Sequence, residues 1–305
     1  MNKIVQILGP TGVGKSEIAV KLSRAFNGEV ISADSVQIYK GFDIGSSKIT
    51  DEEKYGIPHH LIDVLEPSEQ FNVNKFLELA VEIINNISEK RKLPIVCGGT
   101  ALYLRSMVNG IFEENEQKRI SRDKLNRIEE QYGIKYMWER LNRLDNNYAE
   151  KIGENDKKRI IRGLEIYYNN RVIPSRISSV TFSPFSKFKF LRIGIKLPRE
   201  LIYEKINSRV DRMMKDGFID EVKVLRKRNG SKCPAFGAIG YREISQFLDK
   251  IIDVETAIEL IKQHSRNFAK RQMSWFNNEK DIVWFDPRNE NEVMNFMKIS
   301  LNEKT

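Results

Sequence analysis

The chain has 305 residues, of which 40% are hydrophobic and 30% are charged, a composition typical of globular proteins with a sizeable core. No stretch approaches the roughly 18 apolar residues of a membrane-spanning helix, and two cysteines are too few for a disulfide framework or a zinc cluster. Lys and Arg outnumber Asp and Glu by 51 to 42, a net charge of +9. This excess suits a polyanionic partner, although a merely basic surface would also explain it. The first residues lack the apolar segment of a secretory signal, so we expect a cytoplasmic protein.

Strands and helices are predicted to alternate in the first hundred residues. An apolar run at 4–8 predicts a strand that opens into a glycine-rich loop, and apolar residues at helical spacing over 16–26 predict an amphipathic helix. Further strands are predicted at 29–34 and 93–97, with a helix at 73–90 between them. Strands that alternate with helices favour a parallel sheet, so the pattern indicates an α/β fold.

The chain changes character after the third strand. Residues 113–187 are highly charged and mostly helical in pattern, and they predict an insertion between two parts of the sheet domain, 1–112 and 188–305. Residues 186–197 predict a return to the sheet, and 199–305 predict mostly helices. We therefore expect a P-loop NTPase-like parallel sheet flanked by helices, with a helical insertion domain.

The segment GPTGVGKS fits the phosphate-binding pattern G-x-x-x-x-G-K-[ST] at all of its fixed positions. The predicted strand before it and the predicted helix after it are the context that this motif requires. Backbone N–H groups of such a loop bind an anion, Lys15 adds a charge, and Ser16 can ligate Mg²⁺. The loop accepts a diphosphate as readily as the end of a nucleotide, so it does not by itself demand adenosine. The predicted phosphate-binding residues are Gly9, Pro10, Thr11, Gly12, Val13, Gly14, Lys15 and Ser16.

Two polar residues end or follow the next predicted strands. Asp34 ends the second strand and Thr100 follows the third, and the carboxyl ends of parallel strands are where α/β active sites lie. We therefore expect both residues to face the bound phosphate. A turn or helix cap is the other interpretation of Asp34, and Asp63 is a second candidate acid. His59 and His60 follow a proline and have no third histidine nearby, so they predict a turn and a strand rather than a metal site.

Seven segments occur in the order seen in bacterial tRNA dimethylallyltransferases, and the chain resembles this family from about residue 3 to residue 286. The segments are GPTGVGKS, SADSVQIYKGFDIGSSK, YGIPHHLID, CGGTALYL, NDKKRIIRGLEIY, AIGYREI and AKRQMSWF. The resemblance implies a prenyltransferase that uses Mg²⁺ and dimethylallyl diphosphate. It implies transfer of the dimethylallyl group to the exocyclic N6 amine of the adenosine immediately 3′ of the anticodon in tRNA, with release of diphosphate. Nothing in the sequence demands more than a monomer.

The resemblance also implies roles for single residues. Asp34 matches the general base for the adenine amine, Thr100 a residue between base and diphosphate, and Arg209 a diphosphate-binding arginine. The residues implied to contact tRNA are Asp34, Ser35, Val36, Gln37, Thr100, Arg122, Lys158, Arg159, Ile160, Ile161 and Arg162. The chain departs from the family at 113–118, where it reads EENEQK, and at Gly237, where some relatives have an arginine.

Lys262, Arg266 and Lys270 recur on one face of a predicted helix, where they would hold RNA phosphates or form a solvated face. Three other functions fit parts of the sequence. A small-molecule kinase would use the same phosphate loop, and an isopentenyltransferase for free adenine nucleotides would use the loop and the base. A non-catalytic RNA-binding module would use the basic surface but would not need Lys15, Ser16 and Asp34 together.

Overall fold

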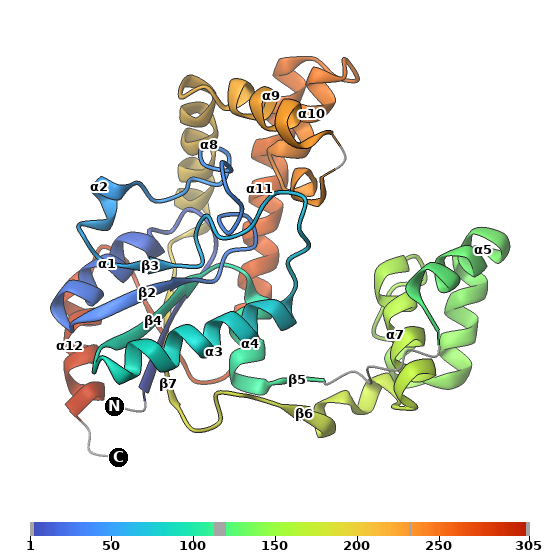
Figure 1. Ribbon diagram of the computed structural model, residues 1–305, viewed down its shortest axis with the longest axis horizontal. Helices are drawn as coiled ribbons and strands as arrows, with labels where there is room; N and C mark the ends of the chain where they lie inside the picture. Colours follow the sequence, from blue (N-terminus) through green and yellow to red (C-terminus); the bar gives the residue numbers. More distant parts are fainter. Residues whose placement is uncertain (1–2, 113–119, 232, 303–305) are drawn as a thin grey trace. The chain divides into compact units, whose positions relative to one another are not determined.

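The computed structural model describes residues 3–112, 120–231 and 233–302, apart from the side chains of 178–181. The chain divides into two compact units, which are drawn in Figure 1. The sheet unit comprises Met1–Val108 and Pro184–Thr305, and the helical unit comprises Asn109–Ser183. The predicted insertion, 113–187, is offset by four residues from the helical unit at each end. Residues 113–118, where the chain departs from the family pattern, lie outside the described residues.

The sheet unit is built on a six-stranded sheet with the order β3-β2-β4-β1-β7-β8, and every described neighbouring pair is parallel. The parallel sheet expected from the sequence is therefore confirmed. The strands are β1 (Lys3–Leu8), β2 (Gly28–Ser32), β3 (His59–His60), β4 (Leu93–Gly98), β7 (Lys189–Ile195) and β8 (Ile282–Phe285). Sequence reasoning missed β8, because it treated the last hundred residues as mostly helical and a four-residue strand carries little periodicity.

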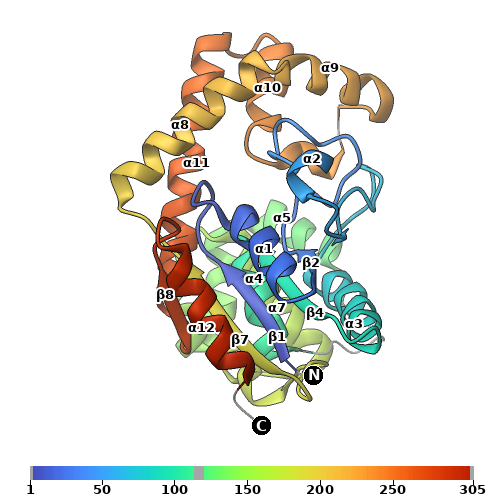
Figure 2. The ribbon, with the colours of Figure 1, turned by 90° about the vertical axis from the view of Figure 1, so that its left-hand side faces the viewer.

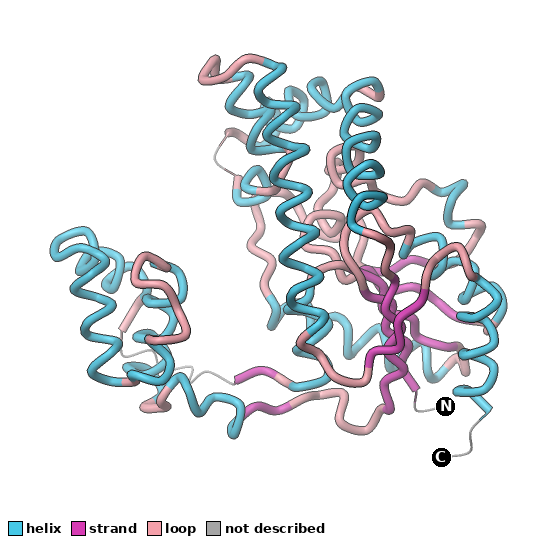
Figure 3. Tube along the Cα trace, turned by 180° about the vertical axis from the view of Figure 1, so that it is seen from behind, coloured by secondary structure: helices cyan, strands magenta, loops and turns pink. Residues whose placement is uncertain are grey.

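Helices cover both faces of the sheet. Val5 and Ile7 of β1 pack into a core with residues of α1 (Lys15–Ala25), α8 (Arg199–Lys215) and α12 (Glu290–Asn302). Gln6, between them, points to the other face, where its amide donates to the carbonyl of Leu104 at 3.0 Å. In Figure 2, α1 and α12 lie in front of the strands, and Figure 3 shows the strands in magenta between helices. Because both faces are covered, all six residues of β1 are buried.

The remaining helices of the sheet unit complete the structure around the carboxyl ends of the strands. Helix α11 packs against α8 and α10, and α9 also packs against α8 and α10. The stripe of Lys262, Arg266 and Lys270 lies on α11, but Lys262 pairs with Asp211 at 2.8 Å and Arg266 donates to Asn207 at 2.7 Å. Those two cations therefore already have protein partners. The helices are α2 (Asp51–Lys54), α3 (Val73–Glu89), α4 (Ala101–Asn109), α9 (Phe218–Asn229), α10 (Tyr241–Leu248) and α11 (Val254–Asn277), with a 3₁₀ turn at Pro234–Gly237.

The helical unit has its own core. Its helices are α5 (Arg122–Leu144), α6 (Asn146–Ala149) and α7 (Lys157–Asn170), and residues of all three pack together. Gly133 interrupts α5 with φ of 81° and ψ of 163°, a conformation that favours glycine. A 3₁₀ segment, Pro174–Val180, precedes β6 (Thr181–Phe182), which forms a short antiparallel pair with β5 (Ile111–Phe112). No helix in the described parts of the chain is long and apolar enough to cross a membrane.

Candidate active site

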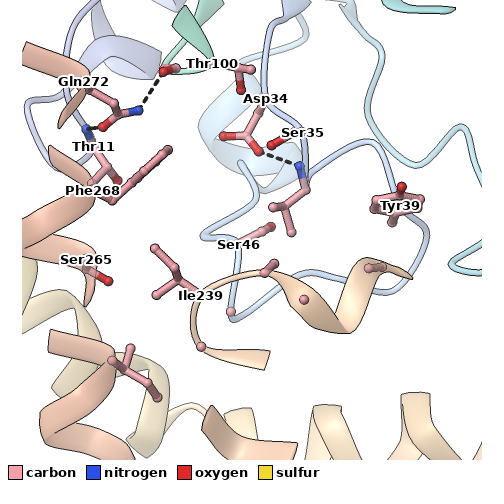
Figure 4. Close-up of a pocket in the computed structure, with 18 of the residues that line it drawn as sticks. Thr11, Asp34, Ser35, Tyr39, Ser46, Thr100, Ile239, Ser265, Phe268 and Gln272 are labelled. Atoms are coloured by element: carbon pink, nitrogen blue, oxygen red, sulfur yellow. Dashed lines mark hydrogen bonds between the residues drawn. The ribbon is translucent and has the colours of Figure 1, made fainter. Parts of the chain in front are cut away.

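A cavity of about 430 Å³ lies at the carboxyl ends of β1, β2 and β4, within the sheet unit. Asp34 and Thr100 both line it, together with Arg209 of α8 and several residues of α11. We call this the main cavity; Figure 4 shows the side chains that surround it. A smaller hollow of about 210 Å³, the loop cavity, lies over the phosphate-binding loop. The residues that line both cavities are Thr11, Asp34, Ser46, Gly99, Arg209, Phe268 and Gln272.

The glycines of the phosphate-binding loop serve its backbone path. A Cβ at Gly9 would lie 2.3 Å from the carbonyl oxygen of Ile195, so no other residue fits between the loop and β7. Gly14 has φ of 90° and ψ of 22° and immediately precedes α1, which is a conformation that L-residues with side chains rarely adopt. The loop therefore leads directly into the N-terminus of α1, whose partial positive charge and free N–H groups favour a bound anion.

The structure separates the eight predicted loop residues into two groups. Gly9 and Pro10 do not line the loop cavity, and Val13 is fully buried in the core beside α1. The N–H of Thr11 already donates to the Oε1 of Gln272 at 2.9 Å. The loop residues that line the loop cavity are Thr11, Gly12, Gly14, Lys15 and Ser16.

Two cationic side chains meet at the loop cavity. The pKa of Lys15 is lowered to about 8, chiefly by burial; Cys97 and Asp34 oppose this shift, and the nearby Arg209 adds to it. Its ammonium donates to the carbonyl of Pro10 at 2.7 Å. Burial also lowers the pKa of Arg209, against the opposing effect of Asp34. The Nε of Arg209 is buried and has no hydrogen-bond partner among the residues that the structure describes. A buried donor of this kind is costly, so an anion in the cavity would stabilise the site.

Asp34 occupies the loop after β2, two residues beyond the end of the strand. Its Oδ1 accepts the N–H groups of Val36 at 2.8 Å and Gln37 at 3.2 Å. The turn-cap interpretation is therefore correct for one oxygen, while Oδ2 accepts no hydrogen bond from the described residues and the carboxylate lines both cavities. Thr100 lies at the start of α4 and lines the main cavity as well. The other candidate acid, Asp63, pairs with Lys48 and lines neither cavity.

The 34–37 segment divides between the two cavities. Ser35 and Val36 line the main cavity, and Gln37 lines the loop cavity. The Gln37 amide is oriented by the protein, because its Nε2 donates to the carbonyls of Ser46 and Ser47, each at 3.3 Å. The segment therefore has a defined shape before any nucleotide binds.

The site fits a Mg²⁺ ion that is shared with a bound phosphate. Among the described residues there is no cluster of three His, Cys, Asp or Glu that could hold a metal alone, and His60 pairs with Glu29 instead. Ser16 is exposed and lines the loop cavity, and Asp34 lies on the same cavity. Mg²⁺ usually binds one or two protein oxygens together with phosphates and water, which matches this sparse set of oxygens.

The residues implied to contact tRNA in the helical unit have unequal access to solvent. Lys158 and Arg159 at the start of α7 are exposed. Arg122 and Arg162 both bond to the buried carboxylate of Glu165, at 2.6 and 3.0 Å. The side chains of Ile160 and Ile161 are buried in the core of the unit, so contact of these two residues with tRNA stays a prediction about their backbone.

Comparison with known proteins agrees with this geometry. The model of the family described as IPP transferase matches residues 37–279. The chain belongs to the IPP transferase family. It is 38% identical to a tRNA dimethylallyltransferase of Halalkalibacterium halodurans, with 99% of each chain covered. It is 44% identical to one of Caldanaerobacter subterraneus, with 93% of this chain and 91% of the relative covered.

Solved structures of the IPP transferase family have the same fold. The tRNA isopentenylpyrophosphate transferase of Bacillus halodurans aligns with a TM-score of 0.73 at 39% identity, over 99% of this chain and 98% of the other. A eukaryotic dimethylallyltransferase described as acting on tRNA aligns with a TM-score of 0.83 at 28% identity, over 100% of this chain and 81% of the other. The similarity therefore extends over both units of the chain.

Sequence reasoning missed Gln272, which lies on α11 between two parts of the site. Its Oε1 accepts the N–H of Thr11, and its Nε2 donates to the carbonyl of Gly99 at 2.7 Å (Figure 4). A Cβ at Gly99 would lie 2.3 Å from that Nε2. Gln272 thus joins the phosphate-binding loop to the segment that carries Thr100. Its position in the AKRQMSWF segment gave no sign of this bridge, because the two contacts span 261 and 173 residues of chain.

The apolar wall of the main cavity was also absent from the sequence analysis. Four large apolar side chains contribute to it, and they come from three separate helices or loops of the sheet unit. They are Met213, Ile239, Ile261 and Phe268. Gly237, where some relatives have an arginine, lines the same cavity.

Proposed function

We propose that this enzyme transfers the dimethylallyl group of dimethylallyl diphosphate to the N6 amine of the adenosine immediately 3′ of the anticodon in tRNA. The observation that carries the proposal is the meeting of Asp34 with the partly buried cations Lys15 and Arg209 at two adjoining cavities. The names of the relatives at 38% and 44% identity support it. Prenyl transfer needs a site for the anionic diphosphate next to a general base, and these residues are suited to both roles.

The loop cavity suits the leaving group. As the bond between the allylic carbon and oxygen breaks, negative charge grows on the diphosphate. Lys15, Arg209 and the loop N–H groups lie where that charge would be stabilised, and such preorganised donors are worth about 2.7–4 kcal/mol each in well-studied enzymes. Ser16 would ligate Mg²⁺, which when bound supplies further neutralisation of the diphosphate.

Asp34 is suited to accept a proton from the adenine amine. That amine is a weak nucleophile because its lone pair is shared with the ring. As its nitrogen bonds to the allylic carbon, one N–H proton passes to the carboxylate of Asp34, whose Oδ2 faces no competing donor among the described residues. Positioned bases of this kind contribute about 10²–10⁴-fold to rate. The apolar wall of Met213, Ile239, Ile261 and Phe268 would then hold the two methyl groups.

The target base must leave its stacked position to reach the main cavity. Base flipping costs a few kcal/mol, and sequence-specific RNA recognition usually targets loops. We expect exposed cations such as Lys158 and Arg159 to bind tRNA phosphates. We also propose that the enzyme acts as a monomer, in the cytoplasm where tRNA is found.

A competition assay tests the proposal. The protein is incubated with Mg²⁺, labelled dimethylallyl diphosphate, an unmodified anticodon stem-loop and an excess of AMP. We expect label in the RNA and not in AMP. Label in AMP alone would favour the free-nucleotide isopentenyltransferase. Transfer of the γ-phosphate of ATP, with the prenyl donor left intact, would favour the kinase.

A further inference from the structure

We propose that Glu221, on α9, is a positioning residue for one part of the active site. It holds the main cavity and the turn that carries Asp34, together called the nucleotide end, in their working shape. The inference rests on the proposed function, and it assigns a role to a carboxylate that lines neither the main cavity nor the loop cavity. Glu221 would act through the segment 43–47, which connects α9 to the turn that carries Asp34.

The Glu221 carboxylate accepts four hydrogen bonds. The N–H groups of three successive residues, Asp43, Ile44 and Gly45, donate to it at 3.2, 2.6 and 3.2 Å. The hydroxyl of Tyr241 donates to it at 2.7 Å. Within the described parts of the chain it forms no ion pair, so backbone dipoles and one hydroxyl satisfy its charge.

A cluster of three aromatic side chains packs against the same segment. Phe218 and Tyr241 pack edge to face, with ring centroids 5.0 Å apart, and Phe42 packs on Tyr241 at 4.3 Å. All three side chains are fully buried. A Cβ at Gly45 would lie 2.2 Å from the ring of Phe218 and 2.6 Å from that of Tyr241. The backbone therefore rests directly on the rings, and Glu221 fixes its orientation there.

The anchored segment reaches the reacting groups by two routes. Gly45 and Ser46 themselves line the main cavity. The carbonyls of Ser46 and Ser47 accept the amide of Gln37 at 3.3 Å, and the N–H of Gln37 donates to Asp34 at 3.2 Å. These hydrogen bonds, linked through the backbone of 45–47 and through Gln37, therefore connect Glu221 to the carboxylate that we propose as the base.

The chemistry of the anchor requires a carboxylate. All three backbone partners are donors, so each needs an acceptor oxygen. Glu221→Gln replaces one oxygen with an NH₂ group, which would face at least one N–H group and leave it unpaired. The segment would shift while the phosphate-binding loop, which Glu221 does not contact, would keep its shape.

The test compares Glu221→Gln with Asp220→Asn, a neighbouring carboxylate on α9 whose side chain is 77% exposed and pairs with Lys223. We measure kcat/KM for the stem-loop RNA, the affinity for inorganic diphosphate with Mg²⁺, and amide hydrogen exchange at 43–45. For Glu221→Gln we expect kcat/KM for RNA to fall about 10–100-fold, the scale of a misplaced catalytic group. Diphosphate affinity should stay within about threefold, and exchange at 43–45 should accelerate. Asp220→Asn should match the wild type in all three measurements.

Tyr241→Phe keeps the test valid if Glu221→Gln fails to fold. It removes one donor and leaves the three backbone contacts, so we expect a fall of about three- to tenfold in kcat/KM for RNA. Unchanged kcat/KM for RNA in both variants, or an equal loss of diphosphate affinity, would overturn the positioning role. A wild-type enzyme that leaves the RNA unmodified would refute the proposed function instead, and that result is seen before any variant is compared.

Discussion

The two ends of the active site differ in how fully the protein satisfies its own polar groups. At the loop cavity, the buried Nε of Arg209 has no hydrogen-bond partner in the described part of the chain, and burial lowers the pKa of Lys15 to about 8. At the nucleotide end, Asp34 Oδ1 accepts two N–H groups, and Glu221 accepts three N–H groups and a hydroxyl. One end is incomplete without an anion, and the other is already ordered.

The difference follows from the chemistry that we propose for each end. A diphosphate carries enough charge to repay the desolvation of two cations, so its site can remain electrostatically unsatisfied until it binds. A nucleobase is neutral and offers few hydrogen bonds. A site for it must therefore be shaped in advance, since binding energy spent on ordering loops would weaken affinity. Substitutions at the two ends should thus have different effects on stability and on ligand affinity.

The largest expected effect is that of Asp34→Asn. The asparagine retains an oxygen that can accept the N–H groups of Val36 and Gln37, but it cannot take up the proton of the amine. We expect kcat to fall by about 10²–10⁴-fold, with diphosphate affinity within a few-fold of the wild type. Single-turnover assays with labelled prenyl donor measure the first quantity, and calorimetry measures the second.

Asp63→Asn is the matched control, because Asp63 pairs with Lys48 outside both cavities. It should leave kcat near the wild-type value. Asp34→Asn with normal turnover and weakened RNA binding would assign Asp34 to docking instead of proton transfer, and the two ends of the site would then differ less than we propose.

The sequence predicted the features of this site that depend on local backbone or on the order of strands. The phosphate-binding loop depends on glycine conformations such as that of Gly14, and the eight-residue motif GPTGVGKS is enough to predict them. Asp34 and Thr100 follow strands, and parallel strands bring their carboxyl ends together. Gln272 and Glu221 could not be found in this way. The two contacts of Gln272 span 261 and 173 residues of chain, and the three backbone contacts of Glu221 span 176 to 178. The partners in all of these contacts are backbone groups, which leave no signal in the sequence.

Arg209→Met should separate activity from stability at the loop cavity. The substitution removes a donor that stabilises the leaving group, so we expect kcat/KM for dimethylallyl diphosphate to fall about 10²–10³-fold. It also removes a buried donor without a partner, whose burial costs about 1–3 kcal/mol. The ligand-free variant should therefore unfold at a temperature equal to or a few degrees above that of the wild type.

Arg212→Met is the matched control, because Arg212 is an exposed residue of the same helix. It should change neither activity nor melting temperature. Scanning calorimetry with and without diphosphate checks the comparison, since diphosphate should stabilise the wild type more than Arg209→Met. A clearly destabilised Arg209→Met would mean that the guanidinium is satisfied within the protein, contrary to the contrast between the two ends.

The smallest expected effect is a pH dependence of anion binding. Because burial lowers the pKa of Lys15 to about 8, the free enzyme loses this positive charge as the pH rises through that value. A bound diphosphate favours the ammonium and raises its pKa, so binding takes up a proton above pH 8 and weakens as the pH rises. Between pH 7 and 9 we expect the Kd for diphosphate to increase about tenfold.

Lys15→Arg supplies the reference for this profile, because a guanidinium stays protonated over the whole range while the ligand ionises identically in both experiments. The variant should lack the tenfold change, even if its affinity is lower at every pH. Titration calorimetry in two buffers of different ionisation enthalpy would detect the proton taken up by the wild type. Identical slopes for wild type and Lys15→Arg would show that Lys15 is charged throughout. In that case only Arg209, and not the pair, would distinguish the loop cavity from the ordered nucleotide end.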